Sequence, residues 1–328
     1  MHTSELDVVG VGNAIVDVIA SADDDFLIQH GIVKGAMTLI DENRAERLYA
    51  AMGAAVIASG GSAANTIAGI ASLGGSTGFI GKVRDDELGH AFRHDIAAAG
   101  TLFPTVAASD GPSTATCLVL VTPDSQRTLN TYLGACVNLA VADIDADLIG
   151  RAQITYLEGY LYDAPSAQRA FHEAAEIAHA AGKKVALTLS DPFCVNRHRD
   201  AFLELVGRHV DVLFANQAEI EALFETPRLD EAIARLHGLT EIAAITRGPA
   251  GSIVLEDAGP IEIGATPVPK VVDTTGAGDL YAAGFLFGLS HGKPLLECGR
   301  LGSLAAAEVI SHFGARPQSD LRLLVGAQ

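Results

Sequence analysis

The sequence predicts an α/β fold in which helices cover both faces of a mostly parallel sheet and a small β insertion is added. Short apolar runs alternate with amphipathic helical patterns from residue 154 to residue 246, as they do around parallel sheets. The run LDVVGVG at 6–12 ends in glycines, which is typical of a buried strand that enters a tight turn. Residues 114–134 alternate in the β manner with no helix, and this change of pattern predicts the insertion.

The first part of the chain supplies strands and one buried helix. After residue 12 the run AIVDVIA continues in extended form and is interrupted by Asp17. SAANTIAGIASLG at 62–74 has small and apolar residues at helical spacing, begins at a serine and ends at a glycine, so it predicts a capped, buried helix. We expect the next strand in TGFIGKV at 77–83 and an amphipathic helix in DELGHAFRHDIAAAG at 86–100.

The insertion is expected to form a lid. TATCLVLVTPDSQRTLNTYLG at 114–134 predicts a hairpin with a PDSQ turn between its two runs. We expect residues of about 14–41 and 103–134 to form this lid within a single domain of residues 1–328. Such a lid would cover the carboxyl ends of the parallel strands, where open α/β sheets bind ligands.

The second half of the chain returns to alternating strands and helices. A short antiparallel edge is expected at 251–269, followed by two long helices, DLYAAGFLFGLSHG and LLECGRLGSLAAAEVISHFG. The alternating segments before this edge are ITYLEGYL, QRAFHEAAEIAHAAG, KVALTLSDP, RDAFLELVGRH, VDVLFAN, AEIEALFE, EAIARLHGL and IAAITRG.

Composition excludes several classes of protein. Hydrophobic residues make up 49% of the chain and the formal net charge is −18, which indicates a globular protein that repels nucleic acid and anionic membranes. Apolar runs stay short of the roughly 20 residues of a membrane span, and MHTSELDVVGVGN lacks the features of a signal peptide. We therefore expect a cytoplasmic protein. The cysteines have no metal-binding or C-x-x-C spacing and are expected to be buried thiols: Cys117, Cys136, Cys194 and Cys298.

The stretch KVVDTTGAGDLYAAGFLFGLS at 270–290 predicts an anion site. The amides of Gly276, Ala277 and Gly278 precede a helix, and glycines allow a phosphate to approach the backbone closely. Asp279 closes this turn, where a carboxylate could accept a proton from a hydroxyl that attacks phosphorus. An aspartate that merely caps the helix predicts the same residue.

A second stretch favours the catalytic interpretation. ASGGSAANTIAGIASLGGSTGFIGKVRDDELG at 58–89 places two glycines before a small-residue helix with Asn65 in its first turn. Together with DTTGAGD it resembles the two signatures of the PfkB or ribokinase family of carbohydrate and nucleoside kinases. The resemblance covers nearly the whole chain, because GVGNAIVD, ANQAE, TRGPAG and AAAEVISHFGARP follow the order of that family.

The resemblance implies a ribokinase-like fold and a role for each matching residue. Asp279 would be the catalytic base, and Gly276, Ala277 and Gly278 would form the anion hole. Acceptor hydroxyls would be bound by Asn13, Asp17, Gly60, Gly61 and Asn65. A buried and unpaired Asp17 would be unfavourable without such a ligand, although an internal ion pair would also explain it.

The resemblance also implies a nucleotide and metal site. Asn216 and Glu219 match an N-x-x-E pattern that organises Mg²⁺ through water, which suits a cation that keeps its waters; a solvated helix face is the alternative for Glu219. Thr246, Gly248 and Gly251 match the loop against ATP. Arg127 matches a lid arginine near the phosphates, or else lies at a strand edge on the surface. Asp273 is a candidate ligand of a monovalent cation such as K⁺.

The lid residues indicate which acceptor substrate the protein would phosphorylate. The N-terminal region and the hairpin look most similar to adenosine kinases and their bacterial relatives, which implies transfer to the 5′-hydroxyl of adenosine. An apolar slot for a purine is expected from Met37, Leu39, Tyr132, Leu133 and Phe193. A sugar kinase would need polar lid residues instead. Apolar lid strands are equally consistent with a dimer contact, so the expected state is a monomer or a homodimer.

Two other functions fit the sequence less well than a kinase does. GVGNAI at 10–15 begins like a dinucleotide fingerprint, but its sixth position is Ile15 and no ribose-binding acid follows at the usual distance. A non-catalytic nucleotide sensor would share the fold, yet the complete turn with Asp279 disfavours it. The sequence therefore predicts an ATP-dependent kinase with small-molecule substrates, with ribokinase- or fructokinase-like sugar phosphorylation as the alternative.

Overall fold

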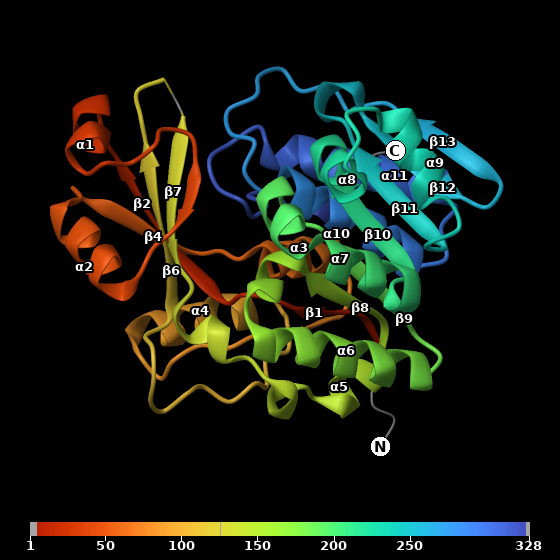
Figure 1. The fold of residues 1–328 in the computed structure, drawn as a ribbon, viewed down its shortest axis with the longest axis horizontal. Coiled ribbons are helices and arrows are strands. Elements are labelled where there is room, and N and C mark those ends of the chain that lie inside the picture. Colours follow the sequence, from red (N-terminus) through yellow and green to blue (C-terminus); the bar gives the residue numbers. More distant parts are fainter. Residues whose placement is uncertain (1–4, 125, 326–328) are drawn as a thin grey trace.

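The computed structural model describes residues 5–124 and 126–325 (Figure 1). Ser125 of the predicted PDSQ turn lies outside the described residues, as do the first four residues of the N-terminal stretch. Figure 1 shows two bodies side by side, a larger one built on the main sheet and a smaller one built on the lid strands.

The larger body is built on an eight-stranded sheet whose order is β13-β12-β11-β10-β9-β8-β1-β5. Neighbours from β5 to β11 pair in parallel, and within the described part of the sheet only the pairs β11–β12 and β12–β13 are antiparallel. This confirms the predicted α/β sheet with its antiparallel edge. Its strands are β1 (Leu6–Val11), β5 (Thr77–Ile80), β8 (Ala152–Glu158), β9 (Lys184–Thr188), β10 (Val212–Asn216), β11 (Ile242–Thr246), β12 (Ser252–Glu256) and β13 (Gly259–Ile263).

Helices cover both faces of this sheet. On one face α3 and α10 pack on β1 and β8, and α11 packs beside α10 on β12 and β13; on the other, α5 and α6 pack on β8. Within the ranges that the structure describes, no helix is long and apolar enough to cross a membrane. The α-helices are α1 (Asp24–Gln29), α2 (Glu42–Ala51), α3 (Ser62–Ser72), α4 (Glu87–Ala98), α5 (Ala146–Arg151), α6 (Pro165–Ala180), α7 (Pro192–His209), α8 (Gln217–Phe224), α9 (Leu229–Leu236), α10 (Ala277–Ser290), α11 (Leu295–Val309) and α12 (Leu321–Val325).

Small residues set the position of α10. An ideal Cβ on Gly69 of α3 would lie 2.6 Å from Leu280, and one on Gly284 would lie 2.3 Å from the carbonyl oxygen of Leu301 in α11. Helix α10 is therefore held between two neighbours at distances that larger side chains would not permit. This packing fixes the amino end of α10, where Asp279 is located.

The smaller body is a five-stranded sheet in the order β3-β7-β6-β2-β4. The predicted hairpin is confirmed, since β6 and β7 pair antiparallel. Strand β4 precedes α3 and was not expected, and residues 102–108 lie along β5 and the loop after it instead of in the lid. The lid strands are β2 (Ile15–Ser21), β3 (Met37–Leu39), β4 (Ala55–Ser59), β6 (Ala115–Val121) and β7 (Arg127–Tyr132), with α1 and α2 on one side.

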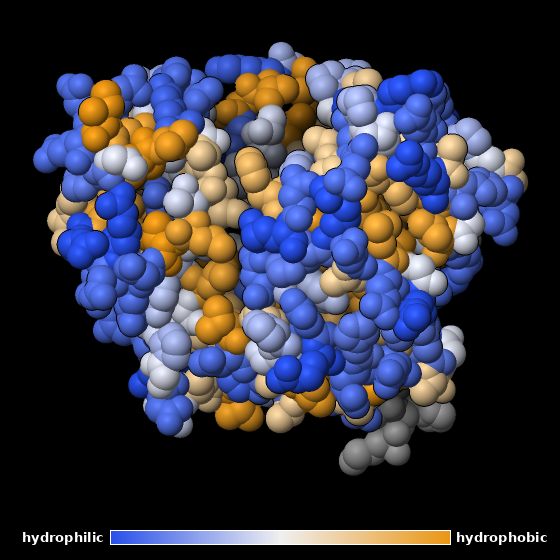
Figure 2. All heavy atoms as spheres, in the orientation of Figure 1, coloured by the Kyte–Doolittle hydropathy of each residue, from blue (hydrophilic) through white to orange (hydrophobic). Residues whose placement is uncertain are grey.

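The surface is hollowed between the lid and the larger body. Figure 2 shows this hollow near the top of the view, with apolar side chains along it and over the lid. Several lid side chains are exposed although they are apolar, among them Val33 at 70% and Val56 at 67%. The lid and the carboxyl ends of the main strands thus face each other across an open groove.

Candidate active site

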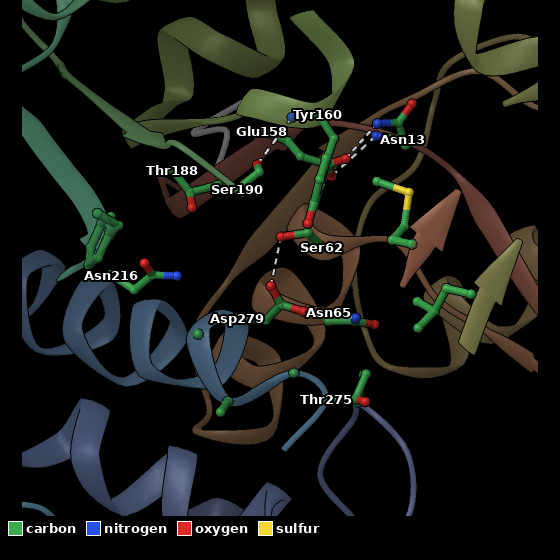
Figure 3. Close-up of a pocket in the computed structure, with 18 of the residues that line it drawn as sticks. Asn13, Ser62, Asn65, Glu158, Tyr160, Thr188, Ser190, Asn216, Thr275 and Asp279 are labelled. Carbon is green, nitrogen blue, oxygen red and sulfur yellow. Dashed lines mark hydrogen bonds between the residues drawn. The ribbon is translucent and has the colours of Figure 1, made fainter. Parts of the chain in front are cut away.

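A cavity of about 500 Å³ lies between the lid and the larger body (Figure 3). One wall consists of the carboxyl ends of five neighbouring parallel strands, which the register places at one edge of the sheet. Ligands of open α/β sheets bind at this edge. The polar residues that line the cavity at these ends are Asn13, Glu158, Thr188, Asn216 and Thr246.

The glycine-rich turn before α10 forms the floor of the cavity. Gly276 is the N-cap of α10 and has φ of 78°, a left-handed conformation that glycine adopts without strain. Ala277 donates its N–H to the carbonyl of Thr274 (3.2 Å), whereas the N–H groups of Gly276 and Gly278 have no acceptor among the described residues. All three residues line the cavity, so the turn places two free amides, those of Gly276 and Gly278, beside it at the positive end of a helix.

The carboxylate of Asp279 is held by two residues of α3. The hydroxyl of Ser62 donates to Oδ1 (2.6 Å) and the amide of Asn65 donates to Oδ2 (3.0 Å), while Thr66 donates to the backbone carbonyl of Asp279 (3.1 Å). Burial raises the pKa of Asp279 to about 6, against these two side-chain hydrogen bonds. A carboxylate with this pKa is ionised at neutral pH and can still accept a proton from an alcohol.

The start of α3 differs from the sequence prediction. Ser62 was expected to cap this helix, but Gly61 is the N-cap, without a side-chain hydrogen bond and with φ of 91°. The hydroxyl of Ser62 is directed instead to Asp279. An ideal Cβ on Gly61 would lie 2.2 Å from the carbonyl oxygen of Asn13, so glycine is needed at that position for conformation and for space.

Asp17 lies on β2 and lines the cavity without a partner. Within residues 5–124 and 126–325 its carboxylate has no hydrogen bond and no ion pair, so the ion pair considered from the sequence is absent there. Burial raises its pKa to about 7, against the charges of Arg316 and Arg127. An ideal Cβ on Gly60 would lie 2.5 Å from Oδ2 of Asp17, which explains a glycine there although Gly60 does not itself line the cavity.

Asn13 is positioned by a carboxylate that the sequence analysis missed. Its amide donates to Oε1 of Glu158 (2.5 Å), and the N–H of Ala63 donates to Oε2 (2.8 Å). Burial raises the pKa of Glu158 to about 7, against these hydrogen bonds. Figure 3 shows Glu158 and Asn13 side by side above Ser62. The available signal was a glutamate directly after ITYL, at the carboxyl end of a predicted strand.

Asn216 and Glu219 form a reciprocal pair at the start of α8. The N–H of Glu219 donates to Oδ1 of Asn216 (2.9 Å), and the side-chain amide of Asn216 donates to Oε1 of Glu219 (2.5 Å). Glu219 is only 4% exposed, so it does not lie on a solvated helix face. Burial raises the pKa of Glu219 to about 7, against the hydrogen bond from the backbone of Asn216. Thr246 and Gly248 line the same end of the cavity, whereas Gly251 does not.

The lid contributes an apolar wall that differs in part from the expected one. Met37, Leu39 and Leu133 line the cavity, together with Leu129. Tyr132 does not, because successive strand residues point to opposite faces and Tyr132 packs into the small core between the lid sheet and α2. Phe193, at the start of α7, is 72% exposed and also lies outside the cavity.

Arg127 pairs with Asp273 rather than facing the cavity. The two side chains form an ion pair and are 10% and 5% exposed, so Arg127 is not a surface residue. Oδ1 of Asp273 also accepts the N–H and the hydroxyl of Thr275, and Oδ2 accepts the N–H of Gly314 (3.0 Å). The carboxylate proposed for a monovalent cation thus already faces a guanidinium.

Other polar residues complete the cavity and were not predicted. Tyr160 extends from the end of β8 toward Ser62, and its backbone N–H donates to the hydroxyl of Ser190 (3.1 Å) (Figure 3). Ser190 has φ of 73°, a strained conformation for a residue other than glycine. Neither Tyr160 nor Ser190 belongs to a distinctive sequence motif. The residues beside them in the cavity are distant in the sequence, so no local pattern indicated them.

Comparison with known proteins gives the same family. Residues 32–321 match the model of the pfkB family of carbohydrate kinases. The structure is similar to that of an adenosine kinase from Sinorhizobium meliloti, with 51% identity, a TM-score of 0.94 and 99% of each chain covered. It is similar to a probable sugar kinase from Rhizobium etli with 46% identity, the same TM-score and the same coverage. Adenosine kinase 1 of Arabidopsis thaliana is 28% identical over 96% of this chain and 97% of its own.

The fold, the glycine-rich turn and the family match lead to one assignment. The ribokinase-like fold predicted from the sequence is confirmed by the two bacterial structures. The chain belongs to the pfkB family of carbohydrate kinases, phosphotransferases that act on alcohol groups and in general use ATP with Mg²⁺.

Proposed function

We propose that the protein transfers the γ-phosphoryl group of ATP to the 5′-hydroxyl of adenosine. One observation carries the proposal: the carboxylate of Asp279 faces a cavity between the free amides of its own turn and the unpaired Asp17. A base, an anion site and a carboxylate that can accept hydrogen bonds from substrate hydroxyls are thereby brought to one place. The rest of the cavity supplies an apolar wall on the lid side.

The chemistry follows from these groups. Asp279 accepts the proton of the 5′-hydroxyl as the oxygen forms a bond to the γ-phosphorus. The bond between this phosphorus and the β–γ bridging oxygen breaks, and its electron pair leaves with ADP. The amides of Gly276, Ala277 and Gly278 stabilise the charge on the transferred group, since all three residues line the cavity. Asp17 binds sugar hydroxyls and orients the acceptor.

The residues present fit a magnesium ion held through water and phosphate. No cluster of three or more metal-binding side chains occurs in the described ranges. Glu219 is buried, lines the cavity and has its orientation fixed by Asn216. Mg²⁺ prefers oxygen ligands and keeps several waters, so one such carboxylate suits it. When bound, the ion would neutralise charge on the β- and γ-phosphates.

The lid supports a nucleoside as the acceptor. Met37, Leu39 and Leu129 belong to β3 and β7, which are paired in register, so they form one apolar surface on the same sheet face as Asp17. A purine can bury its faces against such a surface while the ribose meets the polar residues. Similarity to two adenosine kinases adds support.

A sugar kinase is the second candidate. Asp17, Asn65 and Asn13 can bind the hydroxyls of a free sugar as well as those of a ribose, and a relative is called a probable sugar kinase. The apolar wall disfavours this alternative, because a free sugar would leave that surface without a partner.

Release of ADP from Mg·ATP tests the proposal. The purified protein is assayed with adenosine, inosine, cytidine, ribose, fructose and fructose phosphates, beside Asp279→Asn. We expect turnover with adenosine that is lost in the variant, while nucleotide affinity measured by calorimetry persists. Turnover with a free sugar alone would replace the acceptor and retain the mechanism. Near-normal turnover in Asp279→Asn would exclude that residue as the base.

A further inference from the structure

Arg316 lies in the segment after α11 and contacts the acceptor side of the cavity. This segment is fixed beside the turn before α10: the N–H of Gly314 donates to Asp273 (3.0 Å), and an ideal Cβ on Gly276 would lie 2.7 Å from the carbonyl oxygen of Ala315. The next residue therefore projects its guanidinium toward α3. No sequence motif assigned a role to this arginine.

The guanidinium contacts Asn65. Nε of Arg316 donates to Oδ1 of Asn65 (3.3 Å), and Nδ2 of Asn65 donates to Oδ2 of Asp279 (3.0 Å). A guanidinium can only donate and an ionised carboxylate can only accept. With Arg316 on one side and Asp279 on the other, the amide of Asn65 has a single orientation that satisfies both neighbours.

The charge of Arg316 also acts on Asp17. It lowers the pKa of that carboxylate against the effect of burial, and it does so more than Arg127 does. Burial in turn lowers the pKa of Arg316, and its Nη2 is buried without a hydrogen-bond partner in the described part of the chain. This positive charge is thus held near Asp17 and Asp95 without a direct ion pair to either among the described residues.

Three further groups from neighbouring elements face Asp17. Arg127 of β7 lowers its pKa and Asp279 of α10 raises it. Cys117 of β6 stays neutral, because burial raises the pKa of its thiol. The protonation state of Asp17 therefore depends on two cations, which lower its pKa, and on one carboxylate and burial, which raise it. Of the two cations, Arg316 has the larger effect on this pKa.

We propose that Arg316 is a positioning residue of the phosphoryl transfer, which fixes the amide of Asn65 toward the catalytic base and places a positive charge near Asp17, the carboxylate that binds the acceptor hydroxyls. The proposal rests on the kinase function proposed above. It assigns two separable effects to one side chain, a directional hydrogen bond that acts through Asn65 and a positive charge that acts on Asp17.

Variants that separate these effects test it. Arg316→Met removes both, so we expect the acceptor KM to rise about tenfold, the equivalent of one pKa unit. The acid limb of kcat/KM for adenosine should move to higher pH, while the KM of ATP is retained. Arg316→Lys keeps the charge without the planar fork. Compared with Arg316→Met, it should restore the acid limb, whereas kcat should stay below that of the unaltered protein because Asn65 is no longer oriented. Arg322→Met is the control, since Arg322 is exposed and pairs with Asp320.

The outcomes are distinguishable. Lack of turnover in the unaltered protein would overturn the proposed function and this inference with it. An active unaltered protein with an unchanged pH limb in Arg316→Met would overturn the inference alone. If Arg316→Met does not fold, Arg316→Lys decides: wild-type kcat there would overturn the directional role, and a shifted acid limb would overturn the electrostatic one.

Discussion

The hydroxyl of Ser62 lies 2.6 Å from Oδ1 of Asp279, although the two residues are 217 positions apart in the chain. Ser62 is the first residue of α3 and Asp279 lies in the first turn of α10, so the contact joins the amino ends of two packed helices. The proposed base is therefore positioned by the residue that follows the double glycine.

Ser62→Ala should shift the pH dependence of turnover. The hydrogen bond lowers the pKa of Asp279, so its loss raises that pKa above about 6. A base acts only when it is deprotonated. The acid limb of the pH profile of turnover should therefore move to higher pH by about one unit. Profiles of kcat across the neutral range measure this. Ser59→Ala is the control, because Ser59 donates to Asp95 and not to Asp279; an identical acid limb in both variants would contradict the assignment.

Asp17→Ala should weaken acceptor binding selectively. Hydrogen bonds to a charged group contribute about 1.5–3 kcal/mol, so the acceptor KM should rise roughly tenfold to a hundredfold. The KM of ATP should stay the same, because Asp17 lies on β2 of the lid sheet, whereas Thr246 and Asn216 end strands of the main sheet. Steady-state kinetics with each substrate varied in turn gives both values. Equal increases for both substrates would remove Asp17 from the acceptor site.

Arg127→Gln should destabilise the protein. It leaves the buried carboxylate of Asp273 without its cation, and loss of one partner of a buried ion pair is destabilising by about 3 kcal/mol. Urea unfolding measures the change. Lys34→Gln serves as the control, since Lys34 pairs with exposed carboxylates of the lid and should matter little. The double variant with Asp273→Asn should lose less stability than Arg127→Gln, and simple additivity would show that the pair is not coupled.

The protein without ligands should lose stability as the pH rises through neutrality. Burial raises the pKa of Glu158 and Glu219 from 4.5 to about 7, so the folded state binds more protons than the unfolded state in that interval. The stability that these two groups contribute is fully present below their pKa values in the unfolded state. It is lost as the pH rises through their pKa values in the folded state. Calorimetric melting temperatures at a series of pH values measure this. Glu158→Gln should flatten the decrease; a profile that is flat already in the unaltered protein would contradict the raised pKa values.

The sequence predicted the parts of the site that depend on local pattern. The strand ends and the glycine-rich turn before Asp279 were predicted because turn chemistry and periodicity are local. Tyr132 was placed on the wrong face, although the alternation from Leu129 to Thr131 already contained the answer. The orientation of a lid strand can be decided only after one of its residues is known to face the site.

Other contacts could not be predicted, because they join distant segments. Glu158 reaches Asn13 across 145 positions and Arg316 reaches Asn65 across 251. Nothing in the residue types at these positions shows which neighbour will be in contact, since that is decided by helix packing and by the crossing of the chain between two sheets. Strand β4 was also missed, because it pairs with β2 of the lid, which is distant from it in the sequence.

The cavity has walls of different origin. Met37, Leu39 and Leu129 come from the small sheet, while the turn with Asp279 and the residue pair of α8 come from the larger body. Substitutions in the apolar wall therefore change the shape offered to the acceptor without touching the groups that handle phosphate. Descendants of one ancestral enzyme could acquire new acceptors by changes in a few lid strands, while an unaltered phosphate site is inherited.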